Sequence, residues 1–142
     1  MPVPDVSLEL VDGDVTPLLE HVDGAVFANL WPGVDEDDVP SRSALGHLLG
    51  NSGPVVPLAT WTPGEIGLQH AAGQRVVRTL GERGCAVPEE WYVVSEHPKR
   101  GLVLRTYQTP VEDVLRWLVR AATVLCPLPI VGPWQARIKK KR

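Results

Sequence analysis

Apolar and polar residues follow two different periods along the chain, and each period predicts a kind of element. Residues 109–125 carry apolar side chains three and four positions apart, which is the period of a helix with one buried face. The letters TPVE open this stretch with threonine, proline and glutamate in the places of an N-cap, a first helical residue and a capping-box partner. A similar TPGE predicts an earlier helix over residues 62–80.

Four short runs rich in β-branched and aromatic residues predict strands around these helices. WYVVSE and LVLRTY, residues 91–96 and 102–107, flank HPKRG and predict a β-hairpin. Residues 55–60 and 134–138 predict the first and the last strand, so the order from residue 55 is β-α-β-β-α-β. We therefore predict an α+β fold of the ferredoxin-like type, a two-layer sandwich of four antiparallel strands with both helices on one face.

The first 53 residues predict an α/β extension of that core. SLELV and AVFANLW have the pattern of strands, TPLLEHV predicts a short helix, and SRSALGHLL predicts a further helix with Ser41 as its N-cap. We expect a single domain of 142 residues. It consists of an acidic extension over residues 1–53, a ferredoxin-like core over residues 54–138 on which the extension packs, and a basic tail over residues 139–142.

The net charge of −3 hides a difference between the two parts of the chain. Residues 1–50 carry ten acidic residues and one basic residue, whereas the rest carries seven acidic and thirteen basic residues. We interpret this as two halves that neutralise each other on folding. The chain shows no export signal and no apolar run of the roughly 20 residues that span a bilayer. We expect a cytoplasmic protein in which Cys85 and Cys126 are reduced and lie at opposite ends of the sheet.

Residues with catalytic or metal-binding chemistry form no compact pattern. The four histidines and two cysteines lack metal-ligand spacing, and no nucleophile elbow or phosphate-binding loop is present. We therefore predict no metal, no cofactor and no catalytic residue. His70 falls on the apolar face of the predicted first helix, and we expect it to be a core or rim histidine with one hydrogen bond.

Three segments, residues 61–65, 97–100 and 127–134, are expected to meet at one edge of the predicted sheet. The amides at the start of the first helix and two basic side chains of the hairpin predict a site for an anionic small molecule there. The alternative is a hairpin tip that is only solvated. The expected ligand-binding residues are Trp61, Thr62, Gly64, His97, Lys99, Arg100 and Trp134.

The second helix carries an additional apolar face, formed by Trp117, Ala121 and Val124. A surface helix needs one such face, so the second predicts an interface with the N-terminal extension or with another chain. We therefore expect a small cytoplasmic binding or regulatory protein without catalytic activity of its own. It would act by association with a protein partner or a second copy. The alternative is an enzyme or sensor that binds an anionic ligand at the edge described above.

A resemblance adds a third alternative. VFANL, Val26 to Leu30, resembles the RNP2 strand of RNA-recognition motifs, and RGLVLRTY, Arg100 to Tyr107, resembles their RNP1 strand. The resemblance implies an RNA-binding sheet face on which Phe27 and Tyr107 stack with bases. The sequence departs from the family at Leu102 and Leu104, which stand where RNP1 has its stacking aromatic residues. We therefore favour protein association over RNA binding as the function of this chain.

Overall fold

One antiparallel sheet of seven strands organises the described part of the chain, in the order β1-β7-β2-β3-β4-β6-β5. The structure is a computed structural model and describes residues 5–38, 55–97 and 101–141. The strands are β1 (Asp5–Leu10), β2 (Ala25–Val34), β3 (Leu58–Thr62), β4 (Glu65–Gln69), β5 (Tyr92–Ser95), β6 (Leu102–Arg105) and β7 (Ile130–Lys140). Between them lie the helices α1 (Thr16–Leu19), α3 (Val76–Glu82) and α4 (Val111–Leu125) and the short 3-10 turns η1 (Val11–Gly13) and η2 (Glu36–Asp38).

The predicted ferredoxin-like fold is wrong, because the segment expected to form the first helix is mostly a β-hairpin. Thr62 pairs with Glu65, and Pro63 and Gly64 form the turn that joins β3 to β4. Gly64 has a φ of +83°, which glycine adopts readily and which a helix cannot contain. In β4 the buried residues Ile66 and Leu68 are two apart, which is the period of a strand and not of a helix. Only the last part of the expected helix over residues 62–80 is helical, and it belongs to α3 (Val76–Glu82).

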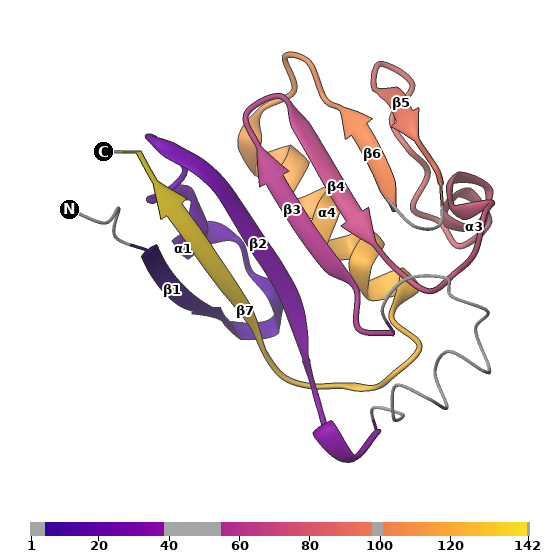
Figure 1. Cartoon of the computed structure of the whole chain (residues 1–142), viewed down its shortest axis with the longest axis horizontal. Helices are drawn as coiled ribbons and strands as arrows, with labels where there is room; N and C mark the ends of the chain where they lie inside the picture. The colour runs from indigo at the N-terminus through magenta and orange to yellow at the C-terminus, as the bar shows by residue number, and fades with distance from the viewer. Residues whose placement is uncertain (1–4, 39–54, 98–100, 142) are drawn as a thin grey trace.

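The predicted N-terminal extension is also wrong, because its strands belong to the same sheet. β7 lies between β1 and β2 and is antiparallel to both (Figure 1). Ala136 of β7 pairs with Leu8 on one side and with Leu30 on the other. Both ends of the chain are therefore needed to build one half of the sheet. The helix expected from Ser41 lies outside the described residues.

Two local predictions are confirmed with changed boundaries. β5 and β6 form the expected hairpin, in which Val93 pairs with Leu104. The second helix forms as α4, but Thr109 is not its cap, since Pro110 is the N-cap residue and no side chain caps the helix. The Thr109 hydroxyl instead accepts a hydrogen bond from the indole N–H of Trp91 at 2.8 Å.

The helices cover one face of the sheet. α4 packs against β2, β3 and β4, and α1 and α3 contact α4 from either side (Figure 1). The core lies between α4 and these strands, where alternate strand residues turn inward. The buried residues of α4 are Val114, Leu115, Leu118, Ala121, Ala122 and Leu125. No described element covers the opposite face of the sheet.

The chain that follows α3 packs against the C-terminal half of α4. Arg83 donates a hydrogen bond to the carbonyl of Val124, and Arg120 donates one to the carbonyl of Gly84. Cys85 and Cys126 are both free thiols, as expected. Their predicted placement at opposite ends of the sheet is wrong, because these hydrogen bonds bring the neighbours of Cys85 to the end of α4 that precedes Cys126.

Substitution of Gly64 by alanine distinguishes the observed hairpin turn from the expected helix. In the turn, the positive φ makes Gly64→Ala destabilising by about 1–2 kcal/mol. At the start of a helix, the same change would stabilise the protein by up to about 1 kcal/mol. Urea unfolding of wild type and Gly64→Ala measures whether the free energy of unfolding falls or rises.

Gly81→Ala is the matched control, because Gly81 lies inside α3 and nothing within 4 Å would meet its Cβ. We expect this variant to be more stable than wild type by up to about 1 kcal/mol. A Gly64→Ala variant as stable as Gly81→Ala would contradict the hairpin.

Candidate functional site

The structure does not bring together the three segments that were expected to form one edge. The turn at Gly64 lies at the end of β4 where Glu65 pairs with Arg105. His97 follows β5 at the other end, where Ser95 pairs with Val103. Lys99 and Arg100 lie outside the described residues. The expected anion site therefore has no shared location in the described part of the chain.

The two tryptophans of that expected site lie on different strands and line different hollows. Trp61, on β3, is buried, and its neighbour Thr62 donates its hydroxyl hydrogen bond to the carbonyl of Glu65. Trp134 is on β7, which β2 separates from β3. Trp61 and Trp134 therefore do not belong to one site, and that either binds a ligand stays a prediction.

The expected interface face of α4 packs inside the chain. Ala121 is fully buried, and the ring of Trp117 meets the ring of Trp91 edge-on at a centroid distance of 5.1 Å. The indole N–H of Trp117 donates to the carbonyl of Ala86 at 3.0 Å, and Val124 is partly buried against the core. That a partner binds at this face stays a prediction.

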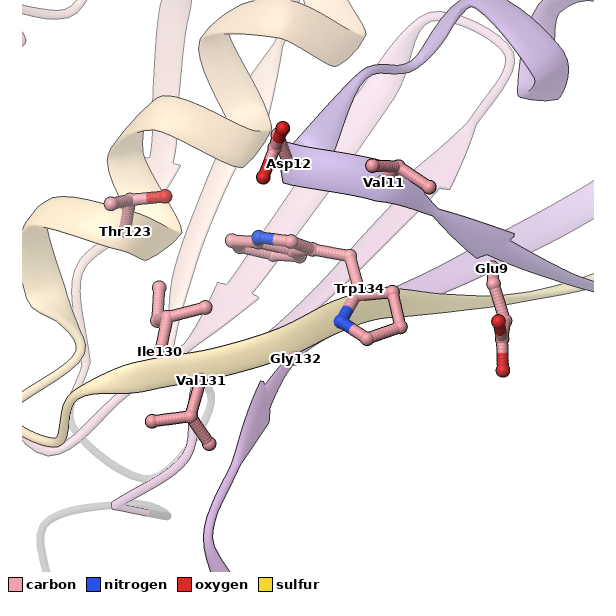
Figure 2. Close-up of a pocket in the computed structure, with 9 residues that line it drawn as sticks. Glu9, Val11, Asp12, Thr123, Ile130, Val131, Gly132 and Trp134 are labelled. Atoms are coloured by element: carbon pink, nitrogen blue, oxygen red, sulfur yellow. The ribbon is translucent and has the colours of Figure 1, made fainter.

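A groove of about 590 Å³ lies between η1, the last turns of α4 and the first residues of β7 (Figure 2). It arises because the two neighbours of β7 have different lengths. The pairing of β1 with β7 ends where Leu10 meets Trp134, whereas the pairing of β2 continues to Ile130. Residues 130–133 of β7 therefore pair with a described strand on one side only. On the other side the backbone of residues 130–132 faces the groove, whereas Pro133 has no N–H and its carbonyl oxygen lies toward Gly33 of β2.

The turn that follows β1 creates this free edge. Asp12 has a φ of 54°, a left-handed conformation that costs a non-glycine residue of the order of 1–3 kcal/mol. Gly13 follows with a φ of 73°, and a Cβ there would lie 3.3 Å from the indole nitrogen of Trp134 and 3.0 Å from Val119. The chain therefore leaves the sheet in a tight turn, which packs directly against the indole ring of Trp134. Backbone strain of this kind gathers at functional sites.

Apolar side chains at the groove are unusually exposed. Val11 and Val131 have relative exposures of 69% and 64%, the highest of the large apolar side chains that the structure describes. Both line the groove, together with Ile130 and Pro133. Trp134 is only 3% exposed, yet its indole N–H forms no hydrogen bond with any described residue. Exposed apolar surface beside a solvent-accessible donor that no described residue satisfies is typical of a place where another molecule binds.

The charge around the groove is negative. Figure 2 shows the carboxylate of Asp12 on the same side of β7 as the ring of Trp134, and that of Glu9 on the other side. Among the described residues that line the groove, none is basic. Thr123, in the last turn of α4, also lines the groove and carries no charge. The groove therefore favours a positively charged group.

A second pair of hollows lies on either side of Tyr107, at the start of α4. Their volumes are about 420 and 630 Å³, and Trp61 and Gly64 line the smaller one. Tyr107 is exposed and has a φ of 51°. Glu112 and Asp113 occupy the first turn of α4, so their carboxylates oppose an anion at the helix start.

The sheet does not offer the aromatic pair that the resemblance to RNA-recognition motifs implies. The two matching segments lie on β2 and β6, which β3 and β4 separate. Tyr107 follows β6 and lines the hollows at the start of α4, while Phe27 lies on β2 opposite Lys139. Phe27 and Tyr107 therefore do not lie side by side.

His70 is buried beyond the end of β4. It is 1% exposed, and its Nδ1 accepts a hydrogen bond from the backbone N–H of Ala72 at 3.0 Å. Of the expected core or rim position, the structure shows the core one, with one hydrogen bond as expected, but beyond a strand end and not on a helix. Its Nε2 has no partner among the described residues, and burial lowers its pKa. The described residues include no cluster of histidine, cysteine and acidic side chains that fits a metal ion.

One feature of the sequence indicates that the chain leaves the sheet at the groove. In SLELVDG, Leu8 and Leu10 alternate as in a strand, but Val11 follows out of phase and is the exposed valine. An apolar residue that breaks the period next to a turn lies outside the core. The role of Val131 depends on where β1 ends, and no local pattern shows this.

Comparison with family models, with curated proteins and with solved structures gave no match to this chain. In the described part of the chain, no helix has both the length and the apolar character that crossing a membrane requires. The function must therefore be argued from the geometry of the site.

The buried His70 predicts how stability depends on pH. Burial lowers its pKa below the ordinary value of 6.5, which the histidine regains on unfolding. Below pH 6.5 the unfolded chain therefore binds more protons than the folded chain, so this contribution to stability is complete above pH 6.5 and decreases as the pH falls. The loss is at most about 1.4 kcal/mol per pH unit.

Urea unfolding of wild type and His70→Gln between pH 8 and pH 5 measures this difference. We expect the free energy of unfolding of wild type to fall more steeply below pH 6.5 than that of the variant. Parallel curves for the two proteins would contradict the assignment, whatever their offset.

Proposed function

We propose that this protein is a non-catalytic binding protein that holds an extended, basic segment of another protein in the groove beside β7. The observation that carries the proposal is the free backbone edge of residues 130–132, left where β1 turns away after Leu10. An extended segment can add to such an edge as a further strand, with main-chain hydrogen bonds supplying affinity.

Side chains around the edge supply the selectivity. A strand that continues the line of β1 would alternate its side chains between the two sides of β7. The carboxylate of Asp12 lies on one side of β7 and that of Glu9 on the other, so each would attract a cationic side chain of the bound strand (Figure 2). Val11 and Val131 offer apolar contact to the stems of lysine or arginine, which pack on apolar surface while the charge stays in water.

Trp134 adds a hydrogen-bond donor to the same place. Its indole N–H has no partner among the described residues, so a carbonyl oxygen of the bound segment would satisfy it. The indole N–H groups of Trp91 and Trp117 already donate to Thr109 and Ala86. The indole signal of Trp134, which lines the groove, would therefore respond to binding, whereas those of Trp91 and Trp117 would not.

A cytoplasmic location is part of the proposal. Two free cysteines and the absence of a membrane-spanning helix among the described residues support it. The carboxylates at the groove would repel the phosphates of a nucleic acid, so a basic protein segment fits this site better than RNA.

Three capped heptapeptides test the proposal by calorimetry at low ionic strength. The first is Thr-Val-Arg-Lys-Val-Val-Thr, in which arginine and lysine point to opposite sides of a strand, the second has glutamine in place of both, and the third has proline in place of the valine that follows lysine. We expect the first to bind and the second to bind about tenfold more weakly, because two exposed ion pairs contribute up to about 1 kcal/mol each. The third should bind weakly as well, since proline has no N–H for the strand edge.

Matched variants locate the charges that matter. Glu9→Gln with Asp12→Asn should weaken the first peptide about tenfold and leave the second unchanged. Glu20→Gln with Glu89→Gln changes the net charge equally at exposed positions outside the groove, and should have no effect beyond a small general one. Equal binding of all three peptides, or equal losses in the two double variants, would contradict the proposal.

A further inference from the structure

The smaller of the two hollows beside Tyr107 is a pocket of about 420 Å³, which we call the Trp61 pocket. It lies where the sheet divides between β2 and β3. β2 begins at Ala25 but pairs with β3 only at residues 28–30. β3 ends at Thr62 and turns into β4, so the two strands diverge toward this end of the sheet (Figure 1). The volume lies in the range of about 300–1,000 Å³ that is usual for small-molecule sites.

The inner part of the Trp61 pocket is buried and mostly apolar. Ala25 of β2 and Val114 of α4 are each 2% exposed, and Trp61 of β3 is 4% exposed. Val22 and Val111 line the pocket as well and are partly buried. An apolar molecule that enters the pocket therefore removes apolar surface from water on several sides, which favours its binding.

Two polar groups of this buried lining have no hydrogen-bond partner among the described residues. They are the indole N–H of Trp61 and the hydroxyl of Thr106, a residue that is only 3% exposed. Neither atom is fully enclosed, since the Nε2 of His70 is the one unsatisfied side-chain atom that the described structure closes off completely. Both residues line the pocket, so a molecule inside it can reach these groups. A few polar groups within an apolar lining are what fixes the orientation of a ligand in a small-molecule site.

The charges at the Trp61 pocket favour an uncharged ligand. Its charged lining residues are Asp23 and Lys141, which are exposed and of opposite sign. Of the two carboxylates in the first turn of α4, that of Glu112 lies 3.4 Å from Arg116, and that of Asp113 lines the neighbouring hollow. The buried part of the lining therefore holds no charge that would compensate an ion for the loss of its hydration.

The turn at Tyr107 fixes the position of Thr106. The backbone N–H of Thr106 donates to the carbonyl of Gly64 at 3.0 Å, and its own carbonyl accepts from the N–H of Thr109 at 3.1 Å. Between these residues Tyr107 has a φ of 51°, a conformation that costs free energy in a non-glycine residue. The turn therefore holds the hydroxyl of Thr106 at the pocket before any ligand binds.

We infer that the Trp61 pocket binds a small, uncharged molecule that has an apolar body and a carbonyl oxygen. The indole N–H of Trp61 can only donate, so the ligand must present an acceptor. The hydroxyl of Thr106 can donate or accept, and adds a second hydrogen bond. The pocket lies at the first turn of α4 and the groove at its last turns, so occupation of one does not depend on the other.

Nuclear magnetic resonance of ¹⁵N-labelled protein during titration with three probes tests this site. Acetophenone carries a neutral carbonyl on an aromatic ring, α-methylstyrene has a CH₂ group in place of that oxygen, and benzoate is an anion of similar size. We expect acetophenone to shift the indole N–H of Trp61 and the amide of Thr106 saturably, with a dissociation constant of about 1 mM. Benzoate should bind at least about tenfold more weakly, because its charge loses hydration in the pocket.

Two variants test the hydrogen bonds to the carbonyl, with binding followed at the amide of Val111. Trp61→Phe and Thr106→Val each remove one polar group and keep a side chain of similar shape. Each should weaken acetophenone about fivefold relative to α-methylstyrene, which has no carbonyl to lose. The ratio of the two affinities is the measure, since a change in packing affects both probes.

A matched pair of variants on β2 locates the site. Ala25→Leu extends a buried side chain of the lining into the pocket, and should weaken acetophenone at least about tenfold. Val26→Leu enlarges the next side chain, which is 40% exposed and does not line the pocket, and should bind like wild type. Three results would each overturn the inference: no saturable shift of Trp61 and Thr106 in wild type, benzoate binding more tightly than acetophenone, or equal losses of acetophenone and α-methylstyrene in both Trp61→Phe and Thr106→Val.

Discussion

The pairing of β7 between β1 and β2 is the constraint on which the rest of the structure depends. It joins residues 5–10 and 25–34 to residues 130–140 through two antiparallel ladders. Ala136 and Ile138 are buried at the centre of this arrangement. Because β7 has eleven residues and β1 has six, one ladder must end before the other. The groove is the direct result of that difference in length.

The same interleaving explains the opposite charges of the two ends of the chain. Acidic residues of the N-terminal part and basic residues of the C-terminal part meet across β1 and β7, as in the ion pair of Asp5 with Arg137. Lys140 donates a hydrogen bond to the carbonyl of His21 at 2.6 Å. Glu9 and Asp12 form no ion pair with a described residue, so their charge remains available at the groove.

What could be predicted from the sequence was local. The period of α4 and the hairpin of β5 and β6 depend on neighbouring residues, and both form. The two capping patterns show the limit of such reasoning. TPVE starts a helix, but TPGE is a turn, because Gly64 takes a positive φ and the residues after it alternate as a strand. The pairing of β7 with both N-terminal strands joins residues 96 to 134 positions apart, from Val34 with Ile130 to Asp5 with Lys139, and no local period shows it.

The candidate site was missed for the same reason. Trp134 was expected to bind a ligand, but together with Trp61 and the hairpin at His97, from which the sheet separates it. Its actual neighbours, Asp12 and Val11, lie more than a hundred residues earlier in the chain. Their side chains meet only after β7 has paired with β1.

Nuclear magnetic resonance of ¹⁵N-labelled protein during titration with the basic heptapeptide tests the central claim most directly. The account predicts saturable shifts of the backbone amides of Val131 and Gly132 and of the indole N–H of Trp134. The indole signals of Trp91 and Trp117, which are hydrogen-bonded inside the protein, should stay in place. Shifts that leave Val131, Gly132 and Trp134 unchanged would contradict the claim that the free edge of β7 is the binding site.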